Sequence, residues 1–206
     1  MSRCLVSGML VGVFLHFGAN AAEPVPSVPA PDVGALVTED VVAGLHEIVR
    51  DEVIQISVKA QNRRLGGIDQ ARIDELDKEW RAETKSDGKQ PLIARTLSNP
   101  ASAQLLRMQA GSLGLYSEIF VMDAKGLNVG QSSITSDYWQ GDEAKFQKTF
   151  PVGANAVFID EPEWHDGTKT WRVQVNMTIP DVKDGTPIGA ATFEINLSEL
   201  QRRKSV

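Results

Sequence analysis

The sequence predicts an α+β fold in which long N-terminal helices pack on a five-stranded antiparallel sheet. Helical spacing of apolar residues dominates residues 38–115, and strand-like alternation replaces it in residues 116–200. Helices and strands that are segregated along a chain in this way favour an antiparallel sheet over alternating βαβ units. The chain has 206 residues, 42% of them hydrophobic and 23% charged, which suits one globular domain.

The first segment, residues 1–21, has the features of a secretory signal peptide. Arg3 supplies the positive charge, Cys4–Phe17 is apolar, and Ala19-Asn20-Ala21 fits the small-residue rule for cleavage. The apolar stretch is shorter than the roughly 20 residues that a bilayer-spanning helix needs. Cleavage would remove the single cysteine of the chain, and a cysteine-free exported protein suits the bacterial periplasm.

The helical part begins after a proline-rich stretch. Residues 22–37 contain closely spaced prolines and are expected to form an extended tether without a core of its own. Thr38, followed by two acidic residues, is typical of a helix start. The pattern predicts one long helix from about Asp40 to Leu65, which Gly66 ends.

Two further helices are predicted before the sheet. Asp69 precedes a helix with Ile73, Leu76 and Trp80 as its buried stripe. The next helix begins at Asn99-Pro100, since proline is favoured at the first helical position. Its expected buried residues are Leu105, Leu106, Met108 and Leu113.

The sheet is expected from short apolar runs separated by turn residues. The clearest strand lies at residues 171–179, where apolar and polar side chains alternate. A short helix is predicted over residues 142–150 and a helical turn over residues 198–204. The predicted strands cover residues 119–122, 128–132, 156–160, 171–179 and 188–197.

The order of these elements and three local runs, 119–132, 136–148 and 180–190, are similar to the Cache family of PAS-like extracellular sensor domains. The resemblance implies a domain that binds a small molecule outside the cell and does not convert it. Amino-acid-binding members carry an arginine five residues after the tyrosine that corresponds to Tyr138. This chain has Glu143 there, so the usual carboxylate clamp is missing.

The resemblance also implies candidate ligand-binding residues. The helix and loop that cover the pocket in the family correspond to the segment that holds Tyr138, Trp139 and Lys145, and an aspartate that contacts the ligand amine corresponds to Asp181. The alternation independently places a polar row on one face of the strand, which consists of Arg172, Gln174 and Asn176. The simpler interpretations are that Trp139 is a core residue and that the polar row is a solvated face.

A small carboxylate is the expected ligand, because a buried Arg172 without an anion would be costly. No cofactor or metal is expected, and the acidic balance of 27 Asp and Glu against 21 Lys and Arg disfavours a nucleic-acid partner. Receptor members of the family continue into a membrane helix, whereas this sequence stops at Val206. A free-standing sensor is therefore expected, acting on a membrane-bound signalling partner or as a homodimer through the long helix.

Two alternative functions stay open at this stage. The acidic loop 160–166 contains Asp160, Glu161, Glu163, His165 and Asp166, which could serve an envelope hydrolase or hold a divalent cation. A solvated turn is the simpler interpretation of this loop. The second alternative is a structural or assembly protein of the envelope. No nucleophile, phosphate-loop or nucleotide motif is recognisable, so a non-catalytic protein is expected.

Overall fold

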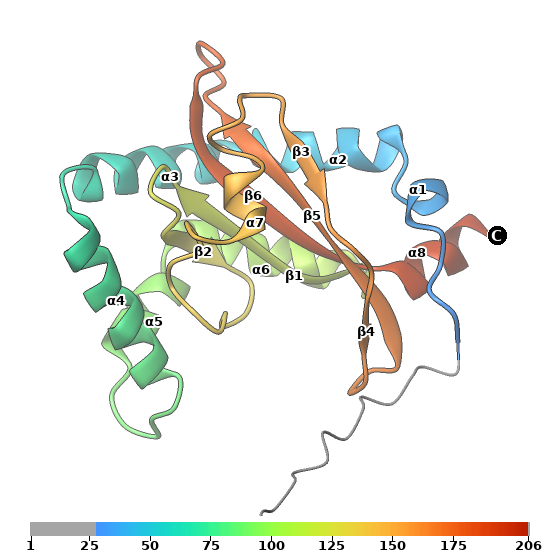
Figure 1. The fold of residues 1–206 in the computed structure, drawn as a ribbon, viewed down its shortest axis with the longest axis horizontal. Coiled ribbons are helices and arrows are strands. Elements are labelled where there is room, and N and C mark those ends of the chain that lie inside the picture. The colour runs from blue at the N-terminus through green and yellow to red at the C-terminus, as the bar shows by residue number, and fades with distance from the viewer. Residues whose placement is uncertain (1–27, 206) are drawn as a thin grey trace, which may run out of the picture.

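The computed structural model describes residues 28–205 and confirms the α+β prediction for them. A six-stranded, fully antiparallel sheet has the order β2-β1-β6-β5-β3, and β4 also pairs with β5 (Figure 1). The predicted signal peptide, residues 1–21, lies outside the described residues. The strands are β1 (Tyr116–Asp123), β2 (Asn128–Gln131), β3 (Val157–Ile159), β4 (Glu163–His165), β5 (Thr170–Pro180) and β6 (Pro187–Asn196).

One face of the sheet forms the main core. Apolar side chains of β5, such as Val173, Val175 and Met177, lie under the helices, as their alternation predicts. The polar residues of β5 lie on the other face. The helices on the core face, drawn behind the sheet in Figure 1, are α2 (Glu39–Val49), α3 (Glu52–Leu65) and α6 (Pro100–Gly111), with α1 (Val33–Leu36) and α8 (Leu197–Lys204) at one end.

The predicted single helix over residues 40–65 is wrong, because it is two helices. The carboxylate of Asp51 accepts the backbone N–H of Val53 at 2.9 Å and of Ile54 at 3.3 Å, which caps a new helix. The buried Gln55 then donates to the Val49 carbonyl at 2.9 Å and fixes the junction. The hydrophobic period continues across the break, so the period alone does not reveal it.

The packed part of the chain begins inside the predicted tether. Asp32 accepts a hydrogen bond from the backbone N–H of Ala35 and caps the short helix α1. Leu36 and Val37 are buried in the main core. The predicted tether is therefore wrong from residue 33 onward.

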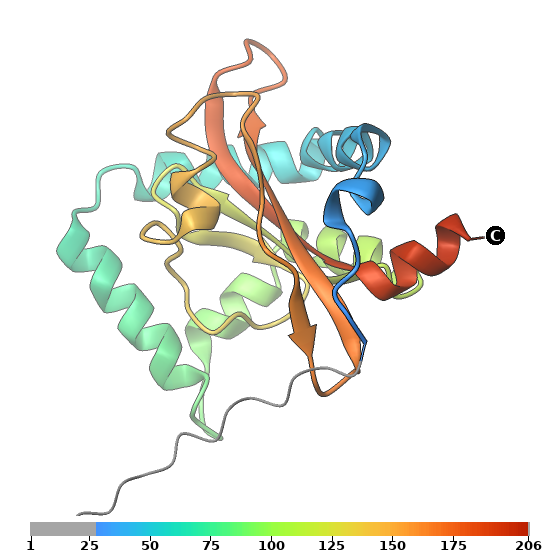
Figure 2. The same cartoon turned by 45° about the vertical axis from the view of Figure 1, so that its right-hand side comes forward.

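A pair of helices stands beside the sheet, at the left in Figure 2: α4 (Gln70–Glu83) and α5 (Pro91–Leu97). The stripe predicted for α4 is buried, and Trp80 is fully inaccessible. Helix α5 was not predicted, and the buried carboxylate of Glu83 caps it by accepting the N–H groups of Leu92 and Ile93. In α6, Leu105 is buried as predicted and Met108 is partly buried, but Leu106 is exposed, and so is Leu113, which follows the helix.

The second face of the sheet is covered only in part. Helix α7 (Ala144–Gln147) is shorter than the predicted 142–150, and its Phe146 packs on Phe120, Met122 and Ala190. This contact closes one half of the face and leaves the other half open. The predicted loop 160–166 contains the short strand β4, which pairs with the start of β5. No helix among residues 28–205 is long and apolar enough to cross a membrane.

Candidate ligand-binding cleft

The open half of the second sheet face holds a cleft of about 190 Å³. Its walls are the start of α7 with the residue before it, the stretch from Asp160 to the first residue of β4, and the polar sides of β5 and β6. Every charged side chain of the cleft therefore belongs to one of four separate segments. The polar residues that line it are Glu143, Lys145, Asp160, Glu161, Glu163, Arg172, Gln174 and Glu194.

The two cations of the cleft are each held by a carboxylate of the protein. Lys145 Nζ lies 2.9 Å from a Glu143 oxygen. Arg172 Nη1 donates to Glu194 at 2.7 Å, and its Nη2 donates to Thr168 at 3.1 Å. Both side chains are mostly buried, at 15% and 18% exposure. The positive charges are thus neutralised before any ligand enters.

Two carboxylates lie directly opposite each other on the floor beside the cleft. Glu118 of β1 and Glu194 of β6 are register partners. Burial raises the pKa of Glu118 and the charge of Glu194 raises it further, although a hydrogen bond from Ser133 at 2.7 Å lowers it. Like charges in this position destabilise a sheet. Charged groups kept at such a cost are characteristic of functional sites.

The rim adds more negative charge. Asp160, Glu161 and Glu163 line the cleft, and none of them forms an ion pair with a residue in the range 28–205. With both cations paired, these three carboxylates leave the cleft with excess negative charge. The field inside it therefore favours a positively charged ligand.

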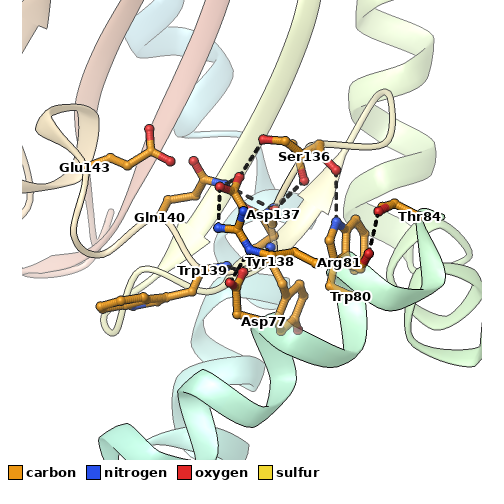
Figure 3. A network of polar contacts seen from close by, with 12 residues as sticks. Asp77, Trp80, Arg81, Thr84, Ser136, Asp137, Tyr138, Trp139, Gln140 and Glu143 are labelled. Carbon is orange, nitrogen blue, oxygen red and sulfur yellow. Dashed lines mark hydrogen bonds and ion pairs between the residues drawn. The ribbon is translucent and has the colours of Figure 1, made fainter. Parts of the chain in front are cut away.

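The wall that carries Glu143 and Lys145 is fixed to α4 (Figure 3). One carboxylate oxygen of Asp77 accepts the backbone N–H groups of Tyr138 and Trp139, at 2.9 and 3.0 Å. Arg81 lies between Asp77 and Asp137 and forms ion pairs with both, at 2.6 and 2.9 Å. This arrangement, which we call the α4 clamp, holds the loop before α7 in place.

The α4 clamp is connected to the cleft through one glutamine. Gln140 donates to Asp137 Oδ1 at 2.7 Å, and its side-chain oxygen accepts a hydrogen bond from Lys145 at 3.3 Å. Trp80 of α4 also donates to the Thr135 carbonyl at 2.9 Å. A chain of polar contacts therefore runs from α4 to the cationic side chain of the cleft wall.

The structure brings together three of the seven candidate residues, Lys145, Arg172 and Gln174. Tyr138 is buried and stacks on Trp80, with ring centroids 5.3 Å apart. Trp139 donates to the Lys125 carbonyl at 2.8 Å and does not line the cleft, which contradicts the expectation that it shares a cavity with the polar row. Core packing, the simpler interpretation, accounts for both aromatic residues.

Asn176 and Asp181 also lie outside the cleft. Asn176 is fully buried and bonds the Phe158 carbonyl and the Thr192 hydroxyl, at 3.2 and 2.8 Å. Asp181 lies in the hairpin between β5 and β6, where it forms an ion pair with Lys59 at 3.0 Å. The backbone N–H of Lys183, followed by Lys59, lowers the pKa of Asp181. Asp181 lines a separate concavity beside Ala154 and Asn155, away from the cleft.

Sequence reasoning missed Glu118 and Glu194. Glu194 is the single charge of β6, and Glu118 directly precedes the apolar residues 119–122 of β1. A charge beside apolar strand residues was the available signal. The acidic loop has no metal-site geometry, since no group of three or more His, Cys, Asp or Glu in residues 28–205 is placed to hold an ion. His165 instead contacts Thr168 at 2.9 Å.

No protein-family model and no curated protein matches the chain. Among solved structures, it is similar to the ligand-binding domain of the Pseudomonas aeruginosa amino acid chemoreceptor PctC in complex with GABA. The identity is 14% and the TM-score 0.35, over 80% of this chain and 64% of that domain. The chain is similarly related in fold to the sensory domain of the Campylobacter jejuni chemoreceptor Tlp3 (CcmL). The identity is 14% and the TM-score 0.39, over 80% of this chain and 64% of that domain.

The chain is also similar to a shorter structure, the sensor domain of E. coli DcuS. Its identity to the chain is 18% and the TM-score is 0.38, over 65% of this chain and 97% of that domain. The chain spans less than two thirds of the length of the two chemoreceptor domains.

Proposed function

We propose that the chain is a periplasmic sensor domain that binds a small molecule in the cleft without converting it. The observation that carries the proposal is the convergence of charged side chains from four segments in one small cleft. A solvated sheet face would not require Arg172 and Lys145 to be withdrawn from water. The Cache-like order of motifs and the secretory signal predicted for residues 1–21 support the same assignment.

The ligand that fits this cleft is a small organic cation, such as a primary amine or diamine. The volume of about 190 Å³ is below the roughly 300–1,000 Å³ of sites for drug-sized ligands. An ammonium group would donate hydrogen bonds to the unpaired rim carboxylates of Asp160, Glu161 and Glu163. A carboxylate ligand, expected from the sequence, would have to displace Glu194 from Arg172 or Glu143 from Lys145.

Binding would act by drawing the rim and the α7 wall together. A ligand shifts a conformational equilibrium only if it binds one state better than the other. A cation held between Glu143 on the wall and Glu163 on the rim would add a link between two segments that already meet where Lys148 Nζ lies 4.0 Å from the centre of the Phe158 ring. The polar contacts of the α4 clamp would pass this change to α4. The change would then reach a membrane-bound partner, or a second copy of the chain bound through α2 and α3.

Calorimetry with putrescine and with succinate tests the ligand class. Putrescine should bind wild type, and Glu194→Gln or Glu163→Gln should weaken it at least tenfold because each removes a carboxylate of the cleft. The matched control is Glu47→Gln, an exposed glutamate on α2 paired with Arg50. At a ligand concentration of 100 times Kd the protein gains about 2.7 kcal/mol, which a thermal shift detects.

Three outcomes would contradict the proposal. If succinate binds, putrescine does not, and Arg172→Ala abolishes the binding, then the ligand is a small carboxylate, as the sequence predicts. Turnover of an amide or ester panel that is lost in Glu163→Gln would favour the envelope hydrolase. If neither putrescine nor succinate binds, a structural or assembly protein of the envelope becomes the favoured function. N-terminal sequencing of the exported chain tests the signal peptide, and the expected first residue is Ala22.

A further inference from the structure

A second concave surface lies on the opposite side of the sheet from the cleft. It is a groove of about 520 Å³ between the outward side of α3 and the turn that joins β5 to β6. Its apolar floor is formed by Ile56, which is 55% exposed, and Val182, which is 57% exposed. The other residues that line it are Arg50, Glu52, Gln55, Lys59, Arg63 and Lys183.

The two sides of the groove are rigidly joined. The side chain of Gln55 is buried, donates to the Pro180 carbonyl at 2.9 Å and accepts the N–H of Val182 at 3.3 Å. Lys59 reaches Asp181 at 3.0 Å. The exposed turn is therefore pre-organised against α3, and a partner would not need to order it on binding.

The rim of the groove has a small excess of positive charge in a chain whose net charge is −6, because two unpaired cations face one unpaired carboxylate, Glu52, among residues 28–205. Arg50 and Lys59 are paired with Glu47 and Asp181. Within the part of the chain that the structure describes, Arg63 and Lys183 form no ion pair. An apolar floor with unpaired cations at its edge is complementary to an acidic surface that carries an apolar side chain.

We propose that this groove docks an acidic segment of a partner protein. The segment places one aliphatic or aromatic side chain between Ile56 and Val182, and its carboxylates pair with Arg63 and Lys183. This proposal supplies the class of partner that the proposed sensor function requires. The groove and the cleft lie on different sides of the sheet and share no residue, so either can fail without the other.

Peptide selection tests the proposal directly. A random 12-residue display library is panned on the exported chain and depleted on the Ile56→Ser, Arg63→Gln double variant. The recovered peptides should be acidic and should contain at least one large apolar residue. In fluorescence anisotropy with a synthesised peptide, each single variant should raise Kd at least tenfold, and raising the salt concentration should weaken binding.

The control is Leu106→Ser, which removes a comparably exposed apolar side chain from α6. This variant should bind the peptide as wild type does. Neutral or basic recovered peptides, or equal binding by the Ile56→Ser variant, would overturn the proposal. Sedimentation that shows a dimer lost in Ile56→Ser would assign the groove to a second copy. Association with anionic vesicles that depends on Arg63 and Lys183 would assign it to a lipid surface, and either result would also overturn the proposal.

Discussion

Replacing Asp77 with alanine should detach the loop before α7 from α4. The Asp77 carboxylate accepts two backbone N–H groups, those of Tyr138 and Trp139, and pairs with Arg81. A hydrogen bond to a charged group contributes about 1.5–3 kcal/mol. Asp77 is 16% exposed, so water compensates only part of the loss. The expected destabilisation is about 3 kcal/mol, from two bonds at the lower end of that range.

Urea denaturation followed by tryptophan fluorescence measures this loss, because Trp80 and Trp139 flank the α4 clamp. Asp77→Asn keeps one acceptor oxygen and should lose only about 1 kcal/mol. The control is Asp74→Ala on the same helix, which loses an exposed contact from Gln70 and should cost less than about 0.5 kcal/mol.

The reasoning is refuted if Asp77→Ala costs no more than the Asp74 control. It is also refuted if Asp77→Ala and Asp77→Asn lose equal stability, since the accepted N–H groups would then contribute nothing. A change in putrescine affinity with Asp77→Asn, a variant that stays folded, would in addition connect the clamp to the cleft.

Three further substitutions test the packing and the charges. Gly189→Ala should cost about 2–3 kcal/mol or prevent folding, because the new Cβ would overlap the Met122 carbonyl oxygen on β1; a melting temperature equal to wild type contradicts this. Gly44→Ala, in an open part of α2, should instead stabilise by about 0.5–1 kcal/mol in the same melt. Glu118→Gln should stabilise by about 0.5 kcal/mol at pH 7. Because burial raises the pKa of Glu118, the charged form of this side chain lowers the stability of the wild type at high pH. Below the ordinary glutamate pKa both proteins carry a neutral side chain here, so the stability difference between Glu118→Gln and wild type should disappear. Urea titrations of both proteins at pH 7 and pH 4 measure this difference.

The helix starts could be predicted because their signals are local. Asp69 and Asn99 are N-caps in the structure, with side chains that accept N–H groups within their own first turns. The end of α2 could not be predicted in the same way. Asp51 acts as a cap at a point where the apolar period continues unbroken, and the buried Gln55 reaches Pro180, 125 residues away. That contact exists only after the sheet has formed.

The sequence predicts the polar row of β5 that lines the cleft, but not the side chains that surround it. The alternation along β5 places Arg172, Gln174 and Asn176 on one face, and the structure agrees. Which aromatic side chains share that face depends on tertiary packing. Tyr138 packs against Trp80 of α4, and Trp139 bonds the carbonyl of Lys125. Both partners are distant in sequence, so the local pattern around residues 138 and 139 does not reveal these contacts.

The different environments of the three polar residues of β5 explain where the cleft lies. Asn176 is closed off because its row continues through Thr192 to Phe120, and the ring of Phe146 from α7 packs on Phe120. Helix α7 ends after one turn, and the side chain that it brings to the rows further along the sheet is the charged Lys145. The next rows, which contain Gln174 and Arg172, are therefore open between the α7 wall and the acidic rim. The length of α7 thus decides which polar residues stay buried and which can meet a ligand.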